Sequence, residues 1–338
     1  MEVAVIASQN IAVLGLGNFG TALARNWLAE GHQVHGWTVE EEVYTSIRDS
    51  EINEKYLPGV VLAGMTVTME LAAAIKGADI VVFALPSSVV LKVIDDALPH
   101  IESGQVLMDL AKGLAPGDQL ISEVVEEKLS DRGLENPLCV MMGPTIAPEL
   151  ARGVYTTALV TSRDIAVATA MADTLSTKTL SLAAGTDPIG AEYWGAFKNV
   201  IALACGVVDG LKEDGRGGDN LKAAVFTSGY REASRLIPEL GAQAETALSA
   251  AGIGDLFVTA TSPHGRNREM GERLGRGQTL AEAEGEMVMV SEGVRAARMF
   301  KTLFASKGLA APFVECVCGL LDEGLSLDDF LVRIMSTP

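Results

Sequence analysis

A chain of 338 residues, nearly half of them hydrophobic, is long enough to form two domains with separate cores. Its 26 basic and 44 acidic residues give a net charge of −18, which argues against nucleic acid and anionic membranes as partners, because both repel an acidic protein. Four cysteines without zinc-ligand or secreted-disulfide spacing, and no evident signal peptide or membrane span, predict a cytoplasmic protein with no metal and no membrane insertion.

About the first 150 residues alternate between short apolar runs and helical segments. Buried strands are expected at 11–15, 33–37, 78–85, 106–110 and 138–142, with helices at 18–30, 41–49, 87–98 and 117–130. Strand-like runs at 154–161 and 178–183 flank a further helix at 164–175. This alternation predicts an α/β fold, namely a Rossmann-type doubly wound parallel sheet.

Helical periodicity dominates after the Asp187-Pro188 turn. Helices are expected at 188–210, 219–237, 242–251, near 267–275, and at 292–307 and 312–322. The sequence therefore predicts two domains: a dinucleotide-binding domain over 1–187 and an all-helical substrate and catalytic domain over 188–338.

A glycine-rich turn joins the first strand to the first helix. Gly15, Gly17 and Gly20, with Asn18 and Phe19 between them, form the pattern G-x-G-x-x-G. The first glycine permits a tight turn, the second lets a pyrophosphate approach the backbone, and the third lets helix and strand pack closely. The position of this pattern between a strand and a helix predicts a dinucleotide site.

Glu40 follows the second strand, where an acidic side chain can accept hydrogen bonds from a ribose 2′-hydroxyl. Because Glu40, Glu41 and Glu42 lie there with no Arg or Lys nearby in the sequence, we expect NAD(H) to be favoured, with NADP(H) possible. An alternative is that these glutamates only stabilise the positive end of the following helix.

Hydride transfer to a carbonyl also needs a proton donor. Among the four histidines only His264, in a polar loop, is a plausible donor, so we expect a different acid. Lys198 lies within an almost wholly apolar helix, and burial disfavours the charged form of lysine, which suits proton transfer near neutral pH. The alternative is that its ammonium group reaches solvent along the apolar stem.

Two further clusters carry candidate binding residues. Lys112 comes just after a strand, at the sheet edge where ligands bind in open α/β folds. In the second half, glycines flank Asp255, Thr259 follows, and Arg266-Asn267 can bind phosphate oxygens. A surface lysine and a solvated loop are the corresponding non-functional interpretations.

An ordered series of motifs then resembles one known family, the NAD(P)-dependent glycerol-3-phosphate dehydrogenases, chiefly of the bacterial type. The resemblance extends from Ile11 to about Arg333. Its motifs are GLGNFGTALA at 15–24, YLPG at 56–59, AKG at 111–113, GPTIAPE at 143–149, GAEYWGAFKNVIALACGVVDGL at 190–211, GIGDLFVTATS at 252–262, GRNREMG at 265–271 and SEGV at 291–294.

The resemblance implies interconversion of glycerol 3-phosphate and dihydroxyacetone phosphate, supplying phospholipid synthesis. It implies a helical domain of the 6-phosphogluconate dehydrogenase type, a site between the two domains and a homodimer. Lys198 would be the catalytic acid and base. Substrate contacts would come from Lys112, Gly143, Thr145, Lys198, Asp255, Thr259, Arg266 and Asn267. Cofactor contacts would come from Gly15, Gly17, Asn18, Phe19, Gly20, Glu40, Lys112, Ala147, Arg266, Val290 and Glu292.

Two alternatives to this interpretation remain open. One is a reductase of a carboxylated substrate, such as ketopantoate or a β-hydroxyacid, on the same fold; the pairing of Lys112 with Arg266-Asn267 favours phosphate instead. The other is a dinucleotide sensor without catalysis, against which Lys198 and Asp255 argue. The family's usual basic residue after the second strand is Val39 here, which disfavours NADP use.

Overall fold

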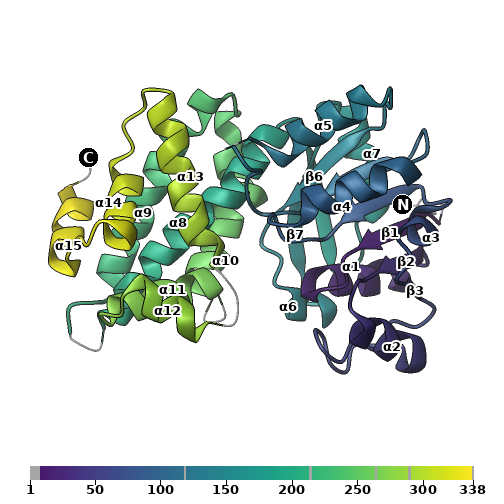
Figure 1. Cartoon of the computed structure of the whole chain (residues 1–338), viewed down its shortest axis with the longest axis horizontal. Helices are drawn as coiled ribbons and strands as arrows, with labels where there is room; N and C mark the ends of the chain where they lie inside the picture. The colour runs from purple at the N-terminus through teal and green to yellow at the C-terminus, as the bar shows by residue number, and fades with distance from the viewer. Residues whose placement is uncertain (1–7, 118, 213–214, 263–264, 288–290, 337–338) are drawn as a thin grey trace. The chain divides into compact units, whose positions relative to one another are not determined.

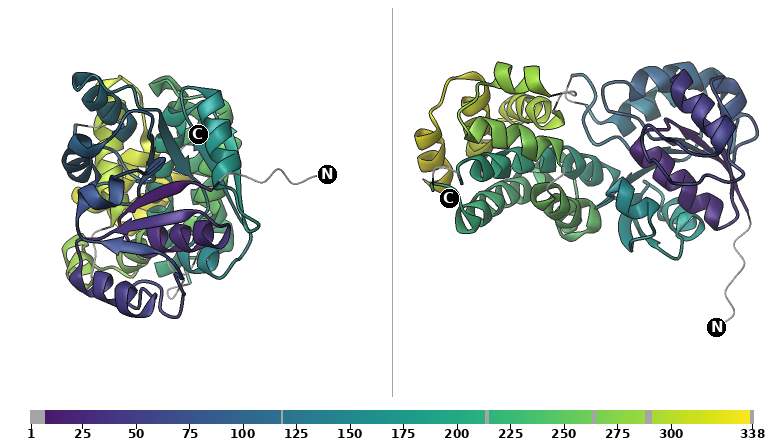
Figure 2. Two further views of the ribbon diagram at one scale, coloured as in Figure 1. Left: turned by 90° about the vertical axis from the view of Figure 1, so that its right-hand side faces the viewer. Right: turned by 90° about the horizontal axis from the view of Figure 1, so that it is seen from below.

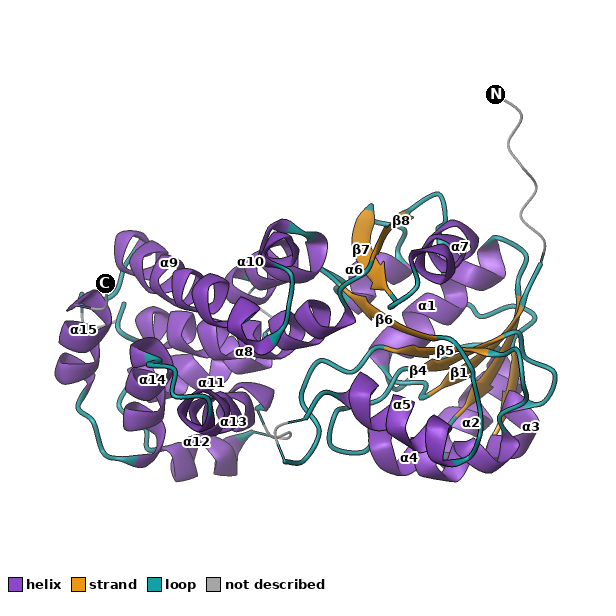
Figure 3. Ribbon diagram, turned by 90° about the horizontal axis from the view of Figure 1, so that it is seen from above, coloured by secondary structure: helices purple, strands orange, loops and turns teal. Residues whose placement is uncertain are grey.

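The structure, a computed structural model, describes residues 8–117, 119–212, 215–262, 265–287 and 291–336. The chain divides into two compact units. One comprises residues 1–115 and 119–188, and the other comprises 116–118 and 189–338. All strands of the described residues belong to the first unit, and the second unit is helical (Figures 1 and 3). The predicted fold class is therefore confirmed.

The first unit is built on one eight-stranded sheet in the order β3-β2-β1-β4-β5-β6-β7-β8. The strands are β1 (Asn10–Leu14), β2 (Gln33–Trp37), β3 (Thr66–Thr68), β4 (Ile80–Phe83), β5 (Val106–Asp109), β6 (Leu138–Met142), β7 (Thr156–Thr161) and β8 (Leu180–Gly185). Strands β1 to β6 are parallel, whereas β7 runs antiparallel to β6. Strand β3 was not expected from the sequence, because three residues are too few to show a period, and no direction was expected for β7.

The strands alternate side chains between two apolar layers, as the pleat of a sheet requires. Ile11 and Val13 contribute to one layer, under α1 (Asn18–Ala29), α2 (Glu41–Ser50), α6 (Ala147–Ala151) and α7 (Ile165–Leu175). Ala12 and Leu14 contribute to the other, under α3 (Leu71–Ile75), α4 (Val90–Ala97) with its 3₁₀ extension (Leu98–His100), and α5 (Ile121–Asp131). Because both faces are covered, the inner strands β1, β4 and β6 are almost wholly buried and hydrophobic.

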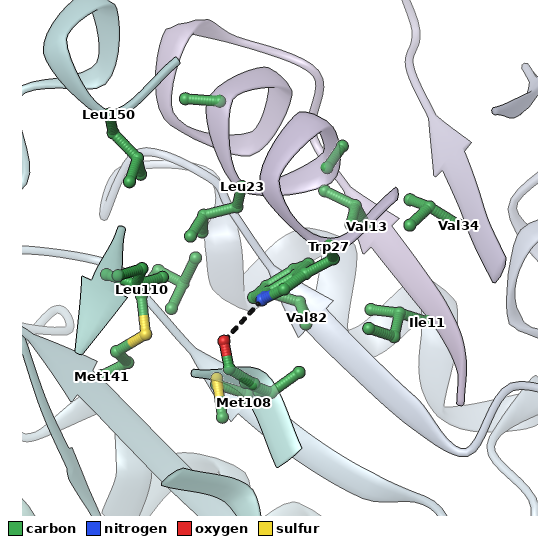
Figure 4. Close-up of a cluster of buried hydrophobic side chains, with 14 of the residues drawn as sticks. Ile11, Val13, Leu23, Trp27, Val34, Val82, Met108, Leu110, Met141 and Leu150 are labelled. Atoms are coloured by element: carbon green, nitrogen blue, oxygen red, sulfur yellow. Dashed lines mark hydrogen bonds between the residues drawn. The ribbon is translucent and has the colours of Figure 1, made fainter. Parts of the chain in front are cut away.

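Trp27 is the largest side chain of the first layer and is fully buried. Figure 4 shows its ring beside Ile11, Val13 and Val82, with one hydrogen bond drawn from the indole. That bond runs from Trp27 Nε1 to the carbonyl of Leu175 at 3.1 Å, so the polar atom of a buried ring is satisfied. Helix α1 is thereby tied to the end of α7.

Strand β1 lies between β2 and β4 (Figure 2, left), so chain connections leave it toward both sides. Such a switch point opens a crevice at the carboxyl ends of the strands, where open α/β sheets bind ligands. The glycine-rich turn follows β1 at this edge, and its Gly15 amide donates to the Trp37 carbonyl at 3.0 Å. The topology therefore places the turn where a dinucleotide binds.

The second unit is built around α8 (Pro188–Gly210), whose residues 190–210 are all buried. The other α-helices are α9 (Asp219–Leu236), α10 (Asp255–Thr261), α11 (Arg266–Gly275), α12 (Leu280–Glu286), α13 (Glu292–Ser306), α14 (Pro312–Asp322) and α15 (Leu327–Ser336). Phe197 of α8 packs edge-on against Phe300 of α13, with ring centroids 4.8 Å apart. No helix of the described residues is long and apolar enough to span a bilayer.

The helix expected at 242–251 is wrong. That stretch contains a 3₁₀ turn at Ala244–Leu248 and the start of a π-type turn at Ala250–Gly254, in which Gly252 has non-helical φ and ψ. A further 3₁₀ turn at Pro238–Leu240 precedes it. A Cβ on Gly252 would lie 2.3 Å from the Ala247 carbonyl oxygen, so only glycine fits there. This compact turn leads directly into α10, whose first residue is Asp255.

Candidate active site

The glycines of the first turn each meet a different steric requirement. Gly15 has φ +106°, and a Cβ there would lie 2.5 Å from the Ala84 carbonyl oxygen. A Cβ on Gly20 would lie 2.0 Å from the Gly15 carbonyl oxygen, so α1 packs directly on the turn. A Cβ on Gly17 would meet no described atom within 4 Å, which leaves the backbone of this residue open to a ligand.

The first turn of α1 suits an anion. Its N-terminal amides have no side-chain cap, and the turn carries no acidic residue. Unpaired amides and the helix dipole together favour a phosphate group at such an end. Asn18 is exposed there, and Phe19 lies beneath the ammonium group of Lys112, 5.9 Å from the ring centroid. These residues fit the pyrophosphate of a dinucleotide.

Glu40 is the N-cap residue of α2, but its side chain makes no hydrogen bond to the helix amides. Glu41 and Glu42 lie in the first turn, where their charges favour the positive end of the helix, as the alternative expected for these glutamates. The Glu40 carboxylate accepts hydrogen bonds from the Tyr56 hydroxyl at 2.7 Å and from Lys55 Nζ at 2.5 Å. The Lys55 bond lowers the pKa of Glu40 below its usual value. The sequence-based premise that no cation lies near Glu40 is therefore wrong, because the fold returns Lys55 from fifteen residues further along the chain.

Lys112 lies among its expected partners in the first unit. Its Nζ donates to the Gly143 carbonyl at 3.0 Å and to Thr145 Oγ1 at 3.3 Å. Gly143 packs so closely on Ala158 that a Cβ would lie 2.7 Å from the Ala158 Cα. Ala147, buried, begins the short helix α6 just beyond. Three predicted substrate residues are thus brought together at the ends of β5 and β6.

Asp109, which was not selected from the sequence, is the last residue of β5, three residues before Lys112. It is fully buried, its Oδ1 accepts from the Ala111 amide at 3.1 Å, and its Oδ2 has no hydrogen-bond partner among the described residues. Burial raises the pKa of Asp109 to about 7. A single Asp at a strand end carries no sequence signal that separates it from an ordinary turn residue.

The second unit holds a buried ion pair. Lys198 Nζ lies 2.6 Å from Asp255 Oδ1, and the two side chains are 5% and 3% exposed. Lys198 also donates to Thr259 Oγ1 at 3.1 Å, and that hydroxyl donates to the Asp255 carbonyl at 2.7 Å. The alternative in which Lys198 reaches solvent is therefore excluded. A charged pair removed from water is expensive unless it is hydrogen-bonded and serves a purpose, which makes it a candidate for chemistry.

Arg266 and Asn267 are the first two residues of α11, where Arg266 is exposed and Asn267 is half-buried. Arg268 lies in a different direction, with its Nε 2.6 Å from Asp209 Oδ2. Burial opposes ionisation of Asp209, but hydrogen bonds from Lys222 and Arg268 lower its pKa below the usual value. Asn267 Nδ2 donates to Asn199 Oδ1 at 2.8 Å, which joins α11 to the residue after Lys198.

Glu292 begins α13 and is half-buried. Val290 and His264 lie outside the described residues, so their expected places stay predictions. Within the part of the chain that the structure describes, no group of His, Cys, Asp or Glu is arranged to hold a metal ion. The candidate residues thus fall into two groups, one in each unit.

Known proteins match nearly the whole chain. A family model described as the NAD-dependent glycerol-3-phosphate dehydrogenase N-terminus matches residues 10–168, and the C-terminus model matches 187–332. Over 332 residues the chain is 38% identical to glycerol-3-phosphate dehydrogenase (NAD(P)+) of Moorella thermoacetica, covering 98% of this chain and 96% of that relative. It is also 38% identical to the Rhodospirillum rubrum enzyme of the same name, covering 98% and 93%.

A crystal structure of glycerol-3-phosphate dehydrogenase from Coxiella burnetii is similar throughout, with a TM-score of 0.88, 29% identity, and coverage of 97% of this chain and 99% of that one. The fold and the site residues define the class: an oxidoreductase that uses a nicotinamide dinucleotide bound on a Rossmann-type sheet. Within that class, the chain belongs to the NAD-dependent glycerol-3-phosphate dehydrogenase family.

Proposed function

We propose that this chain interconverts sn-glycerol 3-phosphate and dihydroxyacetone phosphate with NAD(H) or NADP(H). The activity is that of the family to which the chain belongs. The structural observation that supports it most is the buried Lys198–Asp255 pair with Thr259, because it holds a proton donor where solvent does not reach.

The residues present fit a dinucleotide. Gly17 leaves open space beside the uncapped start of α1, while Gly15 and Gly20 bring strand and helix into contact. We propose that this turn, with Asn18 and Phe19, holds the pyrophosphate, and that Ala147, Val290 and Glu292 lie along the rest of the cofactor. When bound, the nicotinamide supplies the hydride that reduces C2 of the ketone.

Lys198 acts on the oxygen of the same carbonyl. In the reducing direction its ammonium group gives a proton to the developing alkoxide, and in the oxidising direction the neutral amine takes it back. Asp255 stabilises the ammonium and fixes its direction, and Thr259 accepts its second hydrogen bond. Asp255 and Thr259 would also contact substrate hydroxyl oxygens.

Positive charge for the substrate phosphate comes from isolated cations in an otherwise acidic protein. We propose that Arg266 and Asn267 bind the phosphate at the start of α11, where the helix dipole adds to the attraction. Lys112, held by Gly143 and Thr145, contributes a further substrate contact. Lys112 and Arg266 would also contact the cofactor.

We propose that both cofactors are used and that NADH is favoured. Glu40 offers the acceptor for a ribose 2′-hydroxyl at the end of β2. Lys55, paired with Glu40, supplies the cation that a 2′-phosphate needs, so the discrimination is expected to be modest.

The setting we propose is a cytoplasmic homodimer that supplies glycerol 3-phosphate for phospholipid synthesis. The four cysteines are buried and unpaired, as expected in a reducing compartment. Light scattering is expected to report about twice the 35.5 kDa of one chain, and a mass of one chain would contradict the dimer.

The first test is oxidation of NADH and of NADPH, followed by absorbance, with dihydroxyacetone phosphate as substrate. Faster oxidation of NADH than of NADPH is the expected result, and comparable rates would remove only the cofactor preference. Absence of oxidation with either cofactor, together with activity on a carboxylated ketone, would overturn the proposed reaction.

The second test removes the proton donor. Lys198→Met is expected to lower kcat by about 100- to 10,000-fold, as loss of general acid catalysis does, with the Kd of NADH changed less than about threefold. Lys222→Met is the matched control, because Lys222 also pairs with a buried carboxylate, at 2.7 Å from Asp209, in the same unit. A near-normal kcat in Lys198→Met would contradict the assignment of Lys198 as the proton donor.

A further inference from the structure

The side-chain amide of Asn267 joins three segments of the second unit. Its Nδ2 donates to Asn199 Oδ1 of α8 at 2.8 Å. Its Oδ1 accepts two hydrogen bonds of 2.8 Å each, one from the Ser291 hydroxyl and one from the Gly293 amide. One polar side chain thus holds α8, α11 and the start of α13 together.

The orientation of this amide is fixed by its partners. A main-chain N–H can only donate, so the atom facing Gly293 has to be the carbonyl oxygen of Asn267. The nitrogen then faces Asn199, whose own Nδ2 donates to the Gly195 carbonyl at 3.4 Å. Both amides are therefore set in one direction by the backbone around them.

The packing leaves little freedom for an alternative arrangement. Ser291 is fully buried. A Cβ on Gly293 would lie 2.7 Å from the Asn199 carbonyl oxygen and 3.2 Å from Asn267 Oδ1, so only glycine allows α13 to begin this close to α8. A change in the position of Asn267 is therefore expected to shift the start of α13, because the surrounding packing leaves no room for a local rearrangement.

Each joined segment carries a neighbouring residue of the proposed function. Asn199 follows Lys198, the proposed acid. Asn267 follows Arg266, the proposed phosphate ligand, and its Nδ2 carries a second hydrogen besides the one donated to Asn199. Ser291 and Gly293 flank Glu292, the proposed cofactor contact. The amide therefore lies between the segments that would bind substrate and cofactor.

We propose that Ser291 is a positioning residue that couples the two ligands. Its hydroxyl orients the Asn267 amide so that the remaining Nδ2 hydrogen points to the substrate phosphate. A phosphate bound at Asn267 then holds the start of α13 in the position that Glu292 needs to contact the cofactor. The proposal rests on the proposed function, and it adds a residue that acts through Asn267 without touching either ligand.

The coupling is measured at equilibrium. NADH and glycerol 3-phosphate are both reduced and do not react, so the Kd of NADH is determined by fluorescence with and without saturating glycerol 3-phosphate. In the wild type glycerol 3-phosphate is expected to lower that Kd by about threefold or more, as in typical ligand coupling. In Ser291→Ala the two Kd values are expected to agree within about 1.5-fold, while the Kd of NADH alone changes less than about threefold.

Steady-state kinetics give a second readout. The KM for dihydroxyacetone phosphate is expected to rise about five- to tenfold in Ser291→Ala, with kcat lowered less than about threefold, because binding and not proton transfer is affected. Ser228→Ala is the matched control. Ser228 is also buried in the second unit, but its hydroxyl has no hydrogen-bond partner among the described residues, so its removal is expected to change neither quantity.

The possible results distinguish failure of the proposed role of Ser291 from failure of the proposed function on which it rests. An inactive wild type overturns the proposed function. The inference alone is overturned if the wild type is active but its Kd for NADH does not change with glycerol 3-phosphate. It is also overturned if glycerol 3-phosphate lowers the Kd of NADH as much in Ser291→Ala as in the wild type. Ser291→Cys replaces Ser291→Ala if that variant does not fold, because a thiol is a much weaker donor than a hydroxyl. The coupling is expected to fall well below that of the wild type, and undiminished coupling likewise counts against the inference.

Discussion

Two buried aspartates in this chain have opposite surroundings. Asp255 lies 2.6 Å from the ammonium of Lys198, so its charge is compensated. Asp109 lies where no cation is paired with it in the described residues, and burial raises the pKa of its carboxyl group to about 7. We therefore expect Asp109 to make the stability of the first unit depend on pH.

Asp109 predicts the direction of that sensitivity. Because its folded-state pKa lies above the unfolded value, its protonated form is stabilising, and that contribution is complete at about pH 4 and lost as pH rises through 7. Asp109→Asn is expected to abolish this decrease in stability with rising pH. The variant is therefore expected to be more stable than the wild type at pH 8, by an amount on the order of 2–4 kcal/mol.

Urea denaturation of both proteins at about pH 5 and pH 8, on either side of the folded-state pKa, measures this difference. Asp95→Asn is the control, because that exposed carboxylate only pairs with Lys128 on the surface. An Asp109→Asn protein that loses as much stability between these two pH values as the wild type does would contradict the prediction.

Glu40 and Lys55 make a second prediction at the residue scale. Glu40→Arg replaces the ribose acceptor with a cation beside Lys55, so it is expected to lower the ratio of kcat/KM with NADH to that with NADPH by at least about tenfold. Glu42→Arg makes the same change of charge at the other carboxylate that Lys55 contacts, 3.4 Å away, and is expected to shift the ratio far less. Equal shifts would mean that overall charge, not the position of Glu40, controls the preference.

At the scale of elements, α8 and α11 approach until their backbones touch. A Cβ on Gly206 of α8 would lie 2.0 Å from the Arg268 carbonyl oxygen, and one on Gly271 of α11 would lie 1.9 Å from the Leu203 carbonyl oxygen. Glycines four residues apart on each helix, including Gly210 and Gly275, continue the contact. This seam sets the register between the helix that carries Lys198 and the helix that begins with Arg266.

Because α8 and α11 are in backbone contact, adding a single methyl group at this contact is expected to lower the stability of the protein strongly. Gly271→Ala forces two backbones apart and is expected to destabilise the protein by about 3 kcal/mol or more, since overpacking against backbone cannot be relieved by side-chain movement. Gly285→Ala in α12 is the control, because its Cβ meets nothing within 4 Å among the described residues, and it is expected to stabilise by up to about 1 kcal/mol. Denaturation midpoints that fall equally in both variants would contradict the close contact.

At the scale of the whole molecule, the two units have separate cores, and the glycine-rich turn belongs only to the first. A ligand that binds only the folded state stabilises it by about 2.7 kcal/mol at roughly a hundred times its Kd. NADH at that concentration is expected to slow hydrogen exchange in β1, α1 and β4 and to leave α14 and α15 unchanged. Protection confined to the second unit would contradict the proposed dinucleotide-binding domain.

Much of the fold is determined locally and could be predicted from the sequence. The five main strands, the glycine-rich turn and the helical second half each follow from patterns a few residues long. The failures are also local in origin. β3 is too short to show a period, and the apolar residues near 242–251 imitate a helix although Gly252 breaks it. The direction of β7 depends on which strand it meets, which no local pattern records.

The candidate site divides in the same way. The sequence by itself determined the chemical inventory of the site, because Lys198, Lys112 and Arg266 stand out as cations in an acidic chain and the family motifs surround them. Only the tertiary structure decided what the site residues contact: Asp255 for Lys198, Lys55 for Glu40, and Ser291 for Asn267. Turn chemistry and hydrophobic period act over a few residues, whereas the strength of an ion pair or a hydrogen bond depends on distance and burial between segments far apart in the chain.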